Sequence, residues 1–160
     1  METTLNTPSE EVFANSLSSS ETATGNISNE YLAEIVVPTK ALAYLYSRPF
    51  LLVRDPGENK IVEFIDAVFI YKFGTESMSG GGSIFISYLG FCALSAAVSA
   101  ITLMGDKADK AVQMQLANTA NNVMPLNYGL YLQMTESDFD IGKSTSWAKI
   151  HIIYRIHTIV

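Results

Sequence analysis

The sequence predicts an all-β fold, an antiparallel β-sandwich preceded by an extended N-terminal arm. Runs of β-branched and aromatic residues alternate with turn residues along most of the chain. Strands and helices do not alternate regularly, which argues against a parallel α/β sheet. The first part of the chain is rich in Ser, Thr, Glu and Asn. We therefore divide the chain into an arm, residues 1–30, and a β-sandwich domain, residues 31–160.

The N-terminal arm contains too few apolar residues to fold alone. It fits a disordered tail, or a segment that becomes ordered by lying along a neighbouring subunit. In the second case Val12 and Phe13 would anchor it, with Leu17 as a further apolar contact.

The sandwich domain begins with an apolar run, Tyr31 to Val37, which Pro38 ends because proline cannot donate to a sheet ladder. The segment KALAYLY, residues 40–46, fits either one helical turn or a strand. Residues 50–54 predict a strand, and Asp55-Pro56-Gly57 predicts a tight turn, since Pro fixes φ and Gly accepts a positive φ.

The central strand is predicted at residues 60–71, KIVEFIDAVFIY, which contains no Gly or Pro. A strict period of two places apolar groups on both faces of this strand. The first face carries Val62, Phe64, Val68 and Ile70, and the second carries Ile61, Ile65, Phe69 and Tyr71. A strand of this kind needs cover on both sides, from the core and from a second layer, the arm or a neighbouring subunit.

After Gly74 the chain reaches three consecutive glycines, residues 80–82, which predict a flexible crossing. Residues 83–89 alternate and predict a half-buried strand. The uncharged stretch from Ile84 to Met104 has the length of a membrane span, but its serines and initial period of two favour two strands and a turn. Residues 106–119 carry a weak helical pattern.

The last two predicted strands have the clearest alternation. The earlier one, residues 126–134, turns Leu126, Tyr128, Leu130, Leu132 and Met134 to one side. The final strand, residues 147–160, has one apolar face and one mixed face. Its apolar face consists of Ala148, Ile150, Ile152, Tyr154, Ile156 and Val160. Its mixed face consists of Trp147, Lys149, His151, Ile153, Arg155 and His157.

Composition narrows the classes of function. Charged residues make up 16% of the chain, below the roughly 25% of typical soluble domains. Such a surface is commonly hidden in an oligomer. The net charge of −6 argues against nucleic acid as a partner. The single cysteine, Cys92, excludes an intrachain disulfide, and the acidic, hydroxyl-rich first residues do not predict a signal peptide.

Catalytic, cofactor and metal motifs are not evident in the sequence. His151 and His157 would lie roughly 20 Å apart on one strand face, too far to share a metal ion. Asp138 and Asp140 fit an acidic turn better than a calcium loop, because further oxygen ligands are missing at the required spacing. We expect no enzymatic activity, no cofactor and no metal site.

Two segments resemble small structural proteins encoded by tailed bacteriophages. Residues 41–90 follow the family's order of a Pro-x-x-Leu-Val-x-x-Pro-Gly stretch, a long strand, a Gly-rich crossing and a strand with an aromatic end. The matching positions are Pro49, Leu52, Val53, Pro56, Gly57, Gly74, Gly81, Gly82 and Tyr88. Residues 127–156 resemble the family's closing pair of strands, ending in Tyr154-Arg155. Met78-Ser79 replaces the family's Tyr before the glycines, and residues 90–120 match nothing in the pattern.

This resemblance implies a jelly-roll-like sandwich in a virion component, assembled in the host cytoplasm. We expect a capsid decoration or cement protein that forms a homo-oligomer, a trimer by family analogy, and contacts the major capsid protein, without nucleic acid or membrane. A head-fibre or tail accessory protein is the alternative within virions. The candidate interface residues are Val12, Phe13, Leu17, Phe64, Phe69, Trp147, His151 and Arg155. A soluble carbohydrate- or receptor-binding module would instead use Trp147, His151 and Tyr131.

Overall fold

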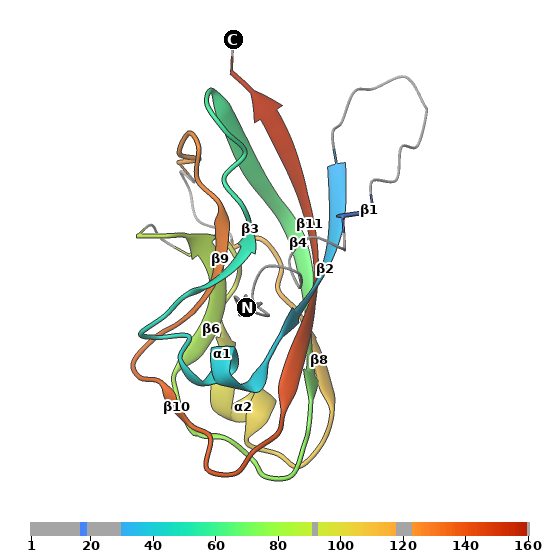
Figure 1. Ribbon diagram of the computed structural model, residues 1–160, viewed down its shortest axis with the longest axis vertical. Helices are drawn as coiled ribbons and strands as arrows, with labels where there is room; N and C mark the ends of the chain where they lie inside the picture. The colour runs from blue at the N-terminus through green and yellow to red at the C-terminus, as the bar shows by residue number, and fades with distance from the viewer. Residues whose placement is uncertain (1–16, 19–29, 91–92, 118–122, 160) are drawn as a thin grey trace, which may run out of the picture.

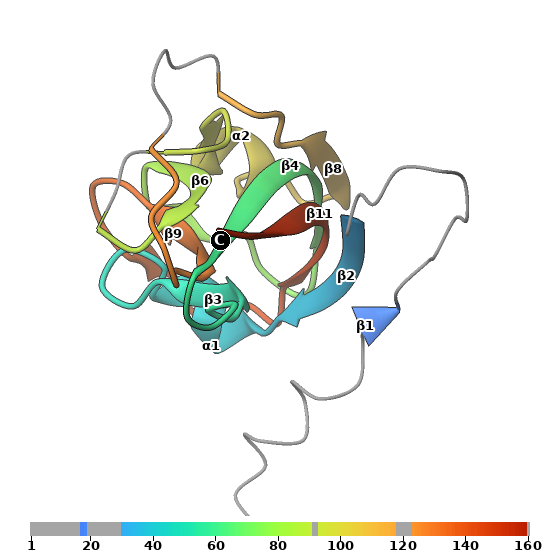
Figure 2. The ribbon, with the colours of Figure 1, turned by 90° about the horizontal axis from the view of Figure 1, so that it is seen from above.

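The chain forms an antiparallel β-sandwich. A computed structural model describes residues 17–18, 30–90, 93–117 and 123–159. Most strands in these ranges belong to two sheets, a five-stranded sheet in the order β1-β2-β11-β4-β8 and a four-stranded sheet in the order β3-β9-β6-β7. Viewed from above, the two sheets enclose the core between them (Figure 2). The predicted all-β sandwich is confirmed.

The strands vary widely in length, and the two longest lie side by side in the five-stranded sheet (Figure 1). That sheet contains β1 (Leu17–Ser18), β2 (Glu30–Val37), β11 (Trp147–Thr158), β4 (Lys60–Lys72) and β8 (Lys110–Gln113). The four-stranded sheet contains β3 (Phe50–Val53), β9 (Leu130–Met134), β6 (Ser83–Tyr88) and β7 (Val98–Ser99). The remaining elements are the β5–β10 pair (Ser79–Gly80 and Phe139–Asp140) and the helices α1 (Thr39–Ala43) and α2 (Ala100–Met104).

The topology is that of a jelly roll. Apart from β1, β5 and β10, the strands of the described chain form nested pairs in sequence order. The first strand pairs with the last, the second with the second-to-last, and the remaining strands follow the same rule. These pairs are β2 with β11, β3 with β9, β4 with β8, and β6 with β7. Contacts of β11 with β4 and of β9 with β6 then join the pairs into two sheets. This nested arrangement of two Greek keys defines the fold, so the jelly-roll-like prediction is also confirmed.

A β-bulge changes which side chains of β4 reach the core. Ile153 pairs with Asp66 and Tyr154 with Phe64, so that Ile65 has no partner and the alternation changes phase. The buried side chains of β4 are Val62, Phe64, Ala67, Phe69 and Tyr71. The predicted pair of faces was therefore wrong: Phe64 and Phe69 share one face, and both are core residues.

Two other predicted elements differ in the structure. The described part of the predicted helical segment, residues 106–117, contains strand β8 instead of a helix, because pairing with β4 outweighs a weak helical period. The strand predicted from Leu126 begins only at Leu130. Asn127 interrupts it with a φ of 59°, a left-handed conformation that asparagine tolerates.

The stretch from Ile84 to Met104 is divided among several elements. It contains most of β6, then β7 and the one-turn helix α2. None of the helices in the described part of the chain has the length and apolar character needed to cross a bilayer. The other ambiguous segment, residues 40–46, forms the one-turn helix α1 and the turn after it.

Candidate functional site: the outer face of the five-stranded sheet

The outer face of the five-stranded sheet carries the mixed side of β11. Alternation turns Ala148, Ile150 and Ile152 inward, where they are buried, and turns Trp147, His151 and Arg155 outward. We define the outer face by the outward side chains of β2, β4, β8 and β11. They are Glu30, Leu32, Glu34, Val36, Ile61, Glu63, Asp66, Val68, Ile70, Lys72, Ala111, Gln113, Trp147, Lys149, His151, Ile153, Arg155 and His157.

The basic side chains of β11 form a stripe on the outer face, which we call the basic stripe. It lies between two acidic stripes, one formed by Glu30 and Glu34 of β2 and the other by Glu63 and Asp66 of β4. Cross-strand register sets His151 opposite Glu34 of β2, and Arg155 opposite both Glu30 of β2 and Glu63 of β4. Neighbouring strands lie about 4.8 Å apart, so opposite charges meet across each pair of strands. The charges of this face are therefore largely balanced within the protomer.

Glu34 joins two basic residues of β11. Its Oε1 lies 2.6 Å from Lys149 Nζ, and its Oε2 lies 3.0 Å from His151 Nε2. The hydrogen bond from Lys149 holds the pKa of the Glu34 carboxyl below its usual range, so this group is ionised at neutral pH. His151 Nε2 lies close to Glu34 Oε2 without the alignment of a hydrogen bond, and the contact is an ion pair only when the imidazole is protonated.

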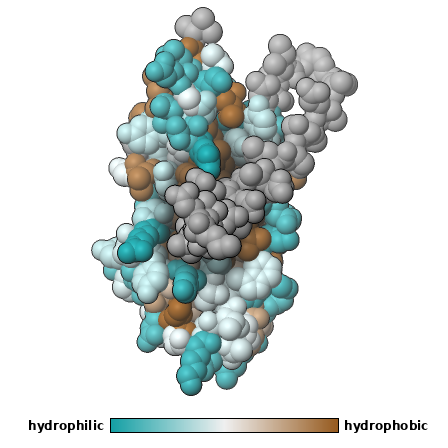
Figure 3. Space-filling model, in the orientation of Figure 1, coloured by the Kyte–Doolittle hydropathy of each residue, from teal (hydrophilic) through white to brown (hydrophobic). Residues whose placement is uncertain are grey.

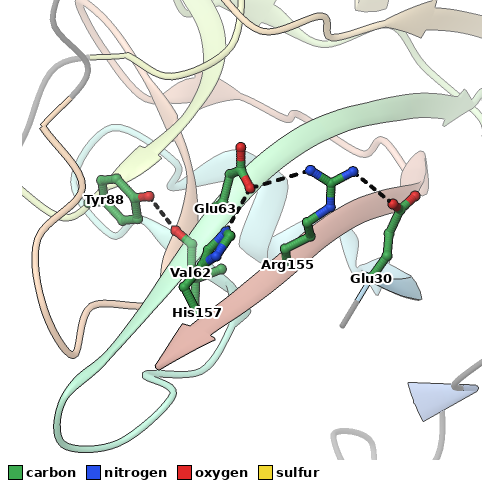
Figure 4. Close-up of polar contacts among 6 residues, drawn as sticks. All are labelled: Glu30, Val62, Glu63, Tyr88, Arg155 and His157. Carbon is green, nitrogen blue, oxygen red and sulfur yellow. Dashed lines mark hydrogen bonds and ion pairs between the residues drawn. The ribbon is translucent and has the colours of Figure 1, made fainter. Parts of the chain in front are cut away.

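A second network extends across three strands (Figure 4). Arg155 Nη2 lies 3.1 Å from Glu30 Oε2, and its Nη1 lies 3.7 Å from Glu63 Oε2. His157 Nε2 lies 2.8 Å from the same Glu63 oxygen. Each pair is solvent-exposed and contributes little stability by itself, so the network fixes side-chain positions rather than the fold.

Apolar side chains lie between these charges. Leu32 and Val36 of β2 are 46% and 45% exposed, and Val68, Ile70 and Ile153 are partly exposed. Elsewhere on the molecule, too, polar and apolar side chains are intermixed, as on the side drawn in Figure 3. A face of this composition suits contact with another protein surface better than chemistry on a small substrate.

The structure brings only part of the predicted interface together. Trp147, His151 and Arg155 share the outer face. Phe64 and Phe69 are 3% and 0% exposed and pack in the core of the chain itself, which leaves no surface for a partner; their assignment to an interface is corrected. Val12 and Phe13 lie outside the described residues, and Leu17 belongs to β1, which pairs with β2 of the same chain.

The residues of the alternative binding module do not converge. Trp147 and His151 lie on the outer face of the five-stranded sheet. Tyr131 belongs to β9 in the opposite sheet and pairs with Ser87 and Leu51, on the other side of the core. A single ligand pocket lined by these three side chains is therefore not formed.

The acidic turn has a structural role at Asp138. Its Oδ1 accepts hydrogen bonds from the backbone N–H groups of Tyr46 and Ser47, at 3.0 and 2.9 Å. Asp140 Oδ1 accepts one from Gly142 N at 3.0 Å. Within the described ranges, no three His, Cys, Asp or Glu side chains are grouped so as to hold a metal ion.

Sequence reasoning did not identify the acidic partners Glu30, Glu34 and Glu63. Alternation along β11 was sufficient to place its basic residues on one face. The partners come from β2 and β4, and only the strand register sets them opposite. Searches against protein-family models, curated proteins and solved structures find no match to this chain.

Proposed function

We propose that the chain is a non-enzymatic virion structural protein of a tailed bacteriophage, a capsid decoration protein that self-associates and contacts neighbouring shell subunits. The virion role rests on the resemblance of residues 41–90 and 127–156. The observation that carries self-association is the charge pattern of the outer face, with basic β11 between acidic residues of β2 and β4.

This pattern is complementary to itself. If a second copy packs face to face and is displaced by one strand, its basic stripe lies over an acidic stripe of the first. The partly exposed Leu32, Val36 and Ile153 then supply the apolar contact area between the charges. Self-association through this face needs no further ligand.

The first experiment tests whether the chain is a component of the virus particle. Particles from the native source are separated on a density gradient, and the chain's peptides are quantified by mass spectrometry in the DNA-containing band. We expect a fixed, high ratio to the major shell protein, as for a decoration protein. A low fixed ratio would indicate a head-fibre or tail accessory protein, and recovery only from the soluble fraction would contradict a virion role.

The self-association surface is tested with Leu32→Asp. We expect this variant to sediment as a monomer while the wild type sediments as an oligomer, because the new carboxylate adds repulsion beside Glu30 and Glu34 and removes an apolar contact. The measurement is sedimentation velocity over a range of protein concentrations.

The matched control is Ile101→Asp, at a side chain in α2 that is 66% exposed and lies off the outer face. It should leave the oligomer intact. Circular dichroism checks that both variants remain folded. Equal sedimentation of wild type and Leu32→Asp at every concentration would exclude the outer face as the interface.

A further inference from the structure

The turn after α1 exposes two tyrosines on a rigid base. We call residues 44–48 the tyrosine loop. Leu42 and Leu45 are fully buried and anchor this part of the chain in the core. Tyr44 and Tyr46, by contrast, are 48% and 53% exposed. Exposed tyrosines held in place are typical of contact surfaces, because they bury much area at little cost in side-chain entropy.

Hydrogen bonds fix the backbone of the tyrosine loop. Asp138 Oδ1 accepts from the N–H groups of Tyr46 and Ser47, and Arg48 N donates to Tyr44 O at 2.6 Å. Hydrogen bonds from Ser47 lower the pKa of Asp138, so the acceptor is a carboxylate at neutral pH. A partner binding this loop would lose little entropy in ordering it.

Positive charge lies on and beside the tyrosine loop, at Arg48, which also helps to lower the pKa of Asp138, and at Lys40 of α1. The Arg48 guanidinium carbon lies 6.0 Å from the centre of the Tyr44 ring. Neither Arg48 nor Lys40 forms an ion pair with a residue of the described ranges, whereas Lys149 and Arg155 both do. A guanidinium stacked on a ring keeps its edge N–H groups available for a carboxylate.

The exposed tyrosines and the nearby positive charges indicate the chemistry of a suitable partner. It would be a short acidic segment that also carries an aromatic or apolar residue. The chain contains such a segment. Its first 39 residues include six acidic residues and no Lys or Arg, and Glu10-Glu11 is followed directly by Val12-Phe13.

The direction of β1 points this segment toward the tyrosine loop. Leu17 pairs with Ala33 and Ser18 with Leu32, so Leu17 is the end of β1 nearer to Val37 and α1. Figure 2 shows β1 at the open edge of β2. Ala33 and Val37 are four positions apart, about 13 Å along the strand, and Glu11 and Leu17 are six positions apart, which can span up to about 20 Å.

We propose that the chain's own Glu10–Phe13 segment binds the tyrosine loop, with its carboxylates at Arg48 and Lys40 and Phe13 against the tyrosines. The opposite charges and the direction of β1 both favour this contact within one chain. The proposal is independent of the virion role and does not require the outer face.

The test is a cross-link in the full chain with Cys92→Ser as background. Ser9→Cys is combined with Ser47→Cys and oxidised at low protein concentration. We expect rapid formation of a product that migrates as a compact monomer on a non-reducing gel. The matched control combines Ser9→Cys with Ile159→Cys, at an exposed side chain near the end of the sandwich opposite α1 (Figure 1), and should cross-link slowly.

Charge reversal tests the basis of the contact. Arg48→Glu should lower the initial rate of cross-linking about tenfold, and Lys107→Glu, at an exposed lysine elsewhere, should not. Adding Glu10→Lys and Glu11→Lys to Arg48→Glu should restore most of the rate. A cross-linked dimer as the main product would overturn the contact within one chain in favour of a neighbouring copy. Equal rates for both cysteine pairs would overturn the proposal altogether.

Discussion

Phe69→Ala is expected to lower the free energy of unfolding by about 3–5 kcal/mol, because it removes a fully buried aromatic ring and leaves a cavity. After the bulge in β4, the side chain of Phe69 points into the core, where Phe69 pairs with Ile150 of β11. A residue that acts only at an interface would instead weaken association and leave the protomer stable. Urea denaturation measures the difference directly.

The matched control is Phe85→Ala, at a partly buried ring of β6 that pairs with Gln133. Phe85→Ala should lower the free energy of unfolding by clearly less than Phe69→Ala does. Both variants are unfolded at several protein concentrations, since the stability of an oligomer depends on concentration and that of a monomer does not. A Phe69→Ala protein as stable as the wild type, with altered sedimentation, would contradict the core position and return this residue to an interface.

Tyr88→Phe is expected to remove a substantial part of the loss of stability between pH 10 and pH 12, a range in which Tyr154, whose pKa is also raised by burial, contributes as well. Tyr88 is 1% exposed, and its hydroxyl donates to Val62 O of the opposite sheet, as Figure 4 shows. Burial, with a smaller effect of the Glu63 charge, raises the pKa of Tyr88 from 10.0 to about 12. The folded state therefore favours the neutral phenol.

The sign of the effect follows from this pKa. Below pH 10 the hydroxyl is neutral in both the folded and the unfolded chain, and its stabilising contribution is complete. As the pH rises toward 12, the unfolded chain loses the proton first, and about 3 kcal/mol of stability is lost. At neutral pH the substitution itself should cost about 1–3 kcal/mol, since a buried carbonyl loses a donor.

Urea unfolding of wild type and Tyr88→Phe from pH 8 to pH 12 tests this prediction. Tyr131→Phe, at a partly exposed tyrosine on the outer side of β9, is the matched control and should keep the wild-type slope. If Tyr88→Phe and wild type lose stability in parallel above pH 10, the titration of Tyr88 does not control alkaline unfolding.

The sequence predicted the class of fold and the last strand well, because a period of two is unambiguous where it is uninterrupted. In β11 the inward set Ala148, Ile150, Ile152 and Tyr154 is buried as expected. In β4 the bulge at Ile65 broke the period, and isoleucine is an ordinary strand residue that gives no sign of a bulge. The short strand β8 forms only through pairing with β4, which no local pattern indicates.

The sequence predicted one half of the candidate site, the basic side chains of β11, but not the acidic side chains that contact them. Alternation placed His151 and Arg155 on a shared face, but not the carboxylates that meet them. Glu30 and Arg155 are 125 positions apart in the sequence, and the register of β2 against β11 depends on the whole core. The tyrosine loop was missed for a different reason: residues 40–46 fitted either a helical turn or a strand, and neither pattern shows that the turn after α1 directs Tyr46 to solvent.

The central place of β11 has a consequence for how the chain is made. Because β11 is the strand that connects β2 to β4, these two strands cannot be joined in one sheet during synthesis until Trp147–Thr158 leaves the ribosome. Folding must then close contacts across nearly the whole chain, which makes it slow compared with folds built from local contacts. Until then the nascent chain exposes apolar strand edges, a kind of surface that makes partly folded chains prone to aggregation.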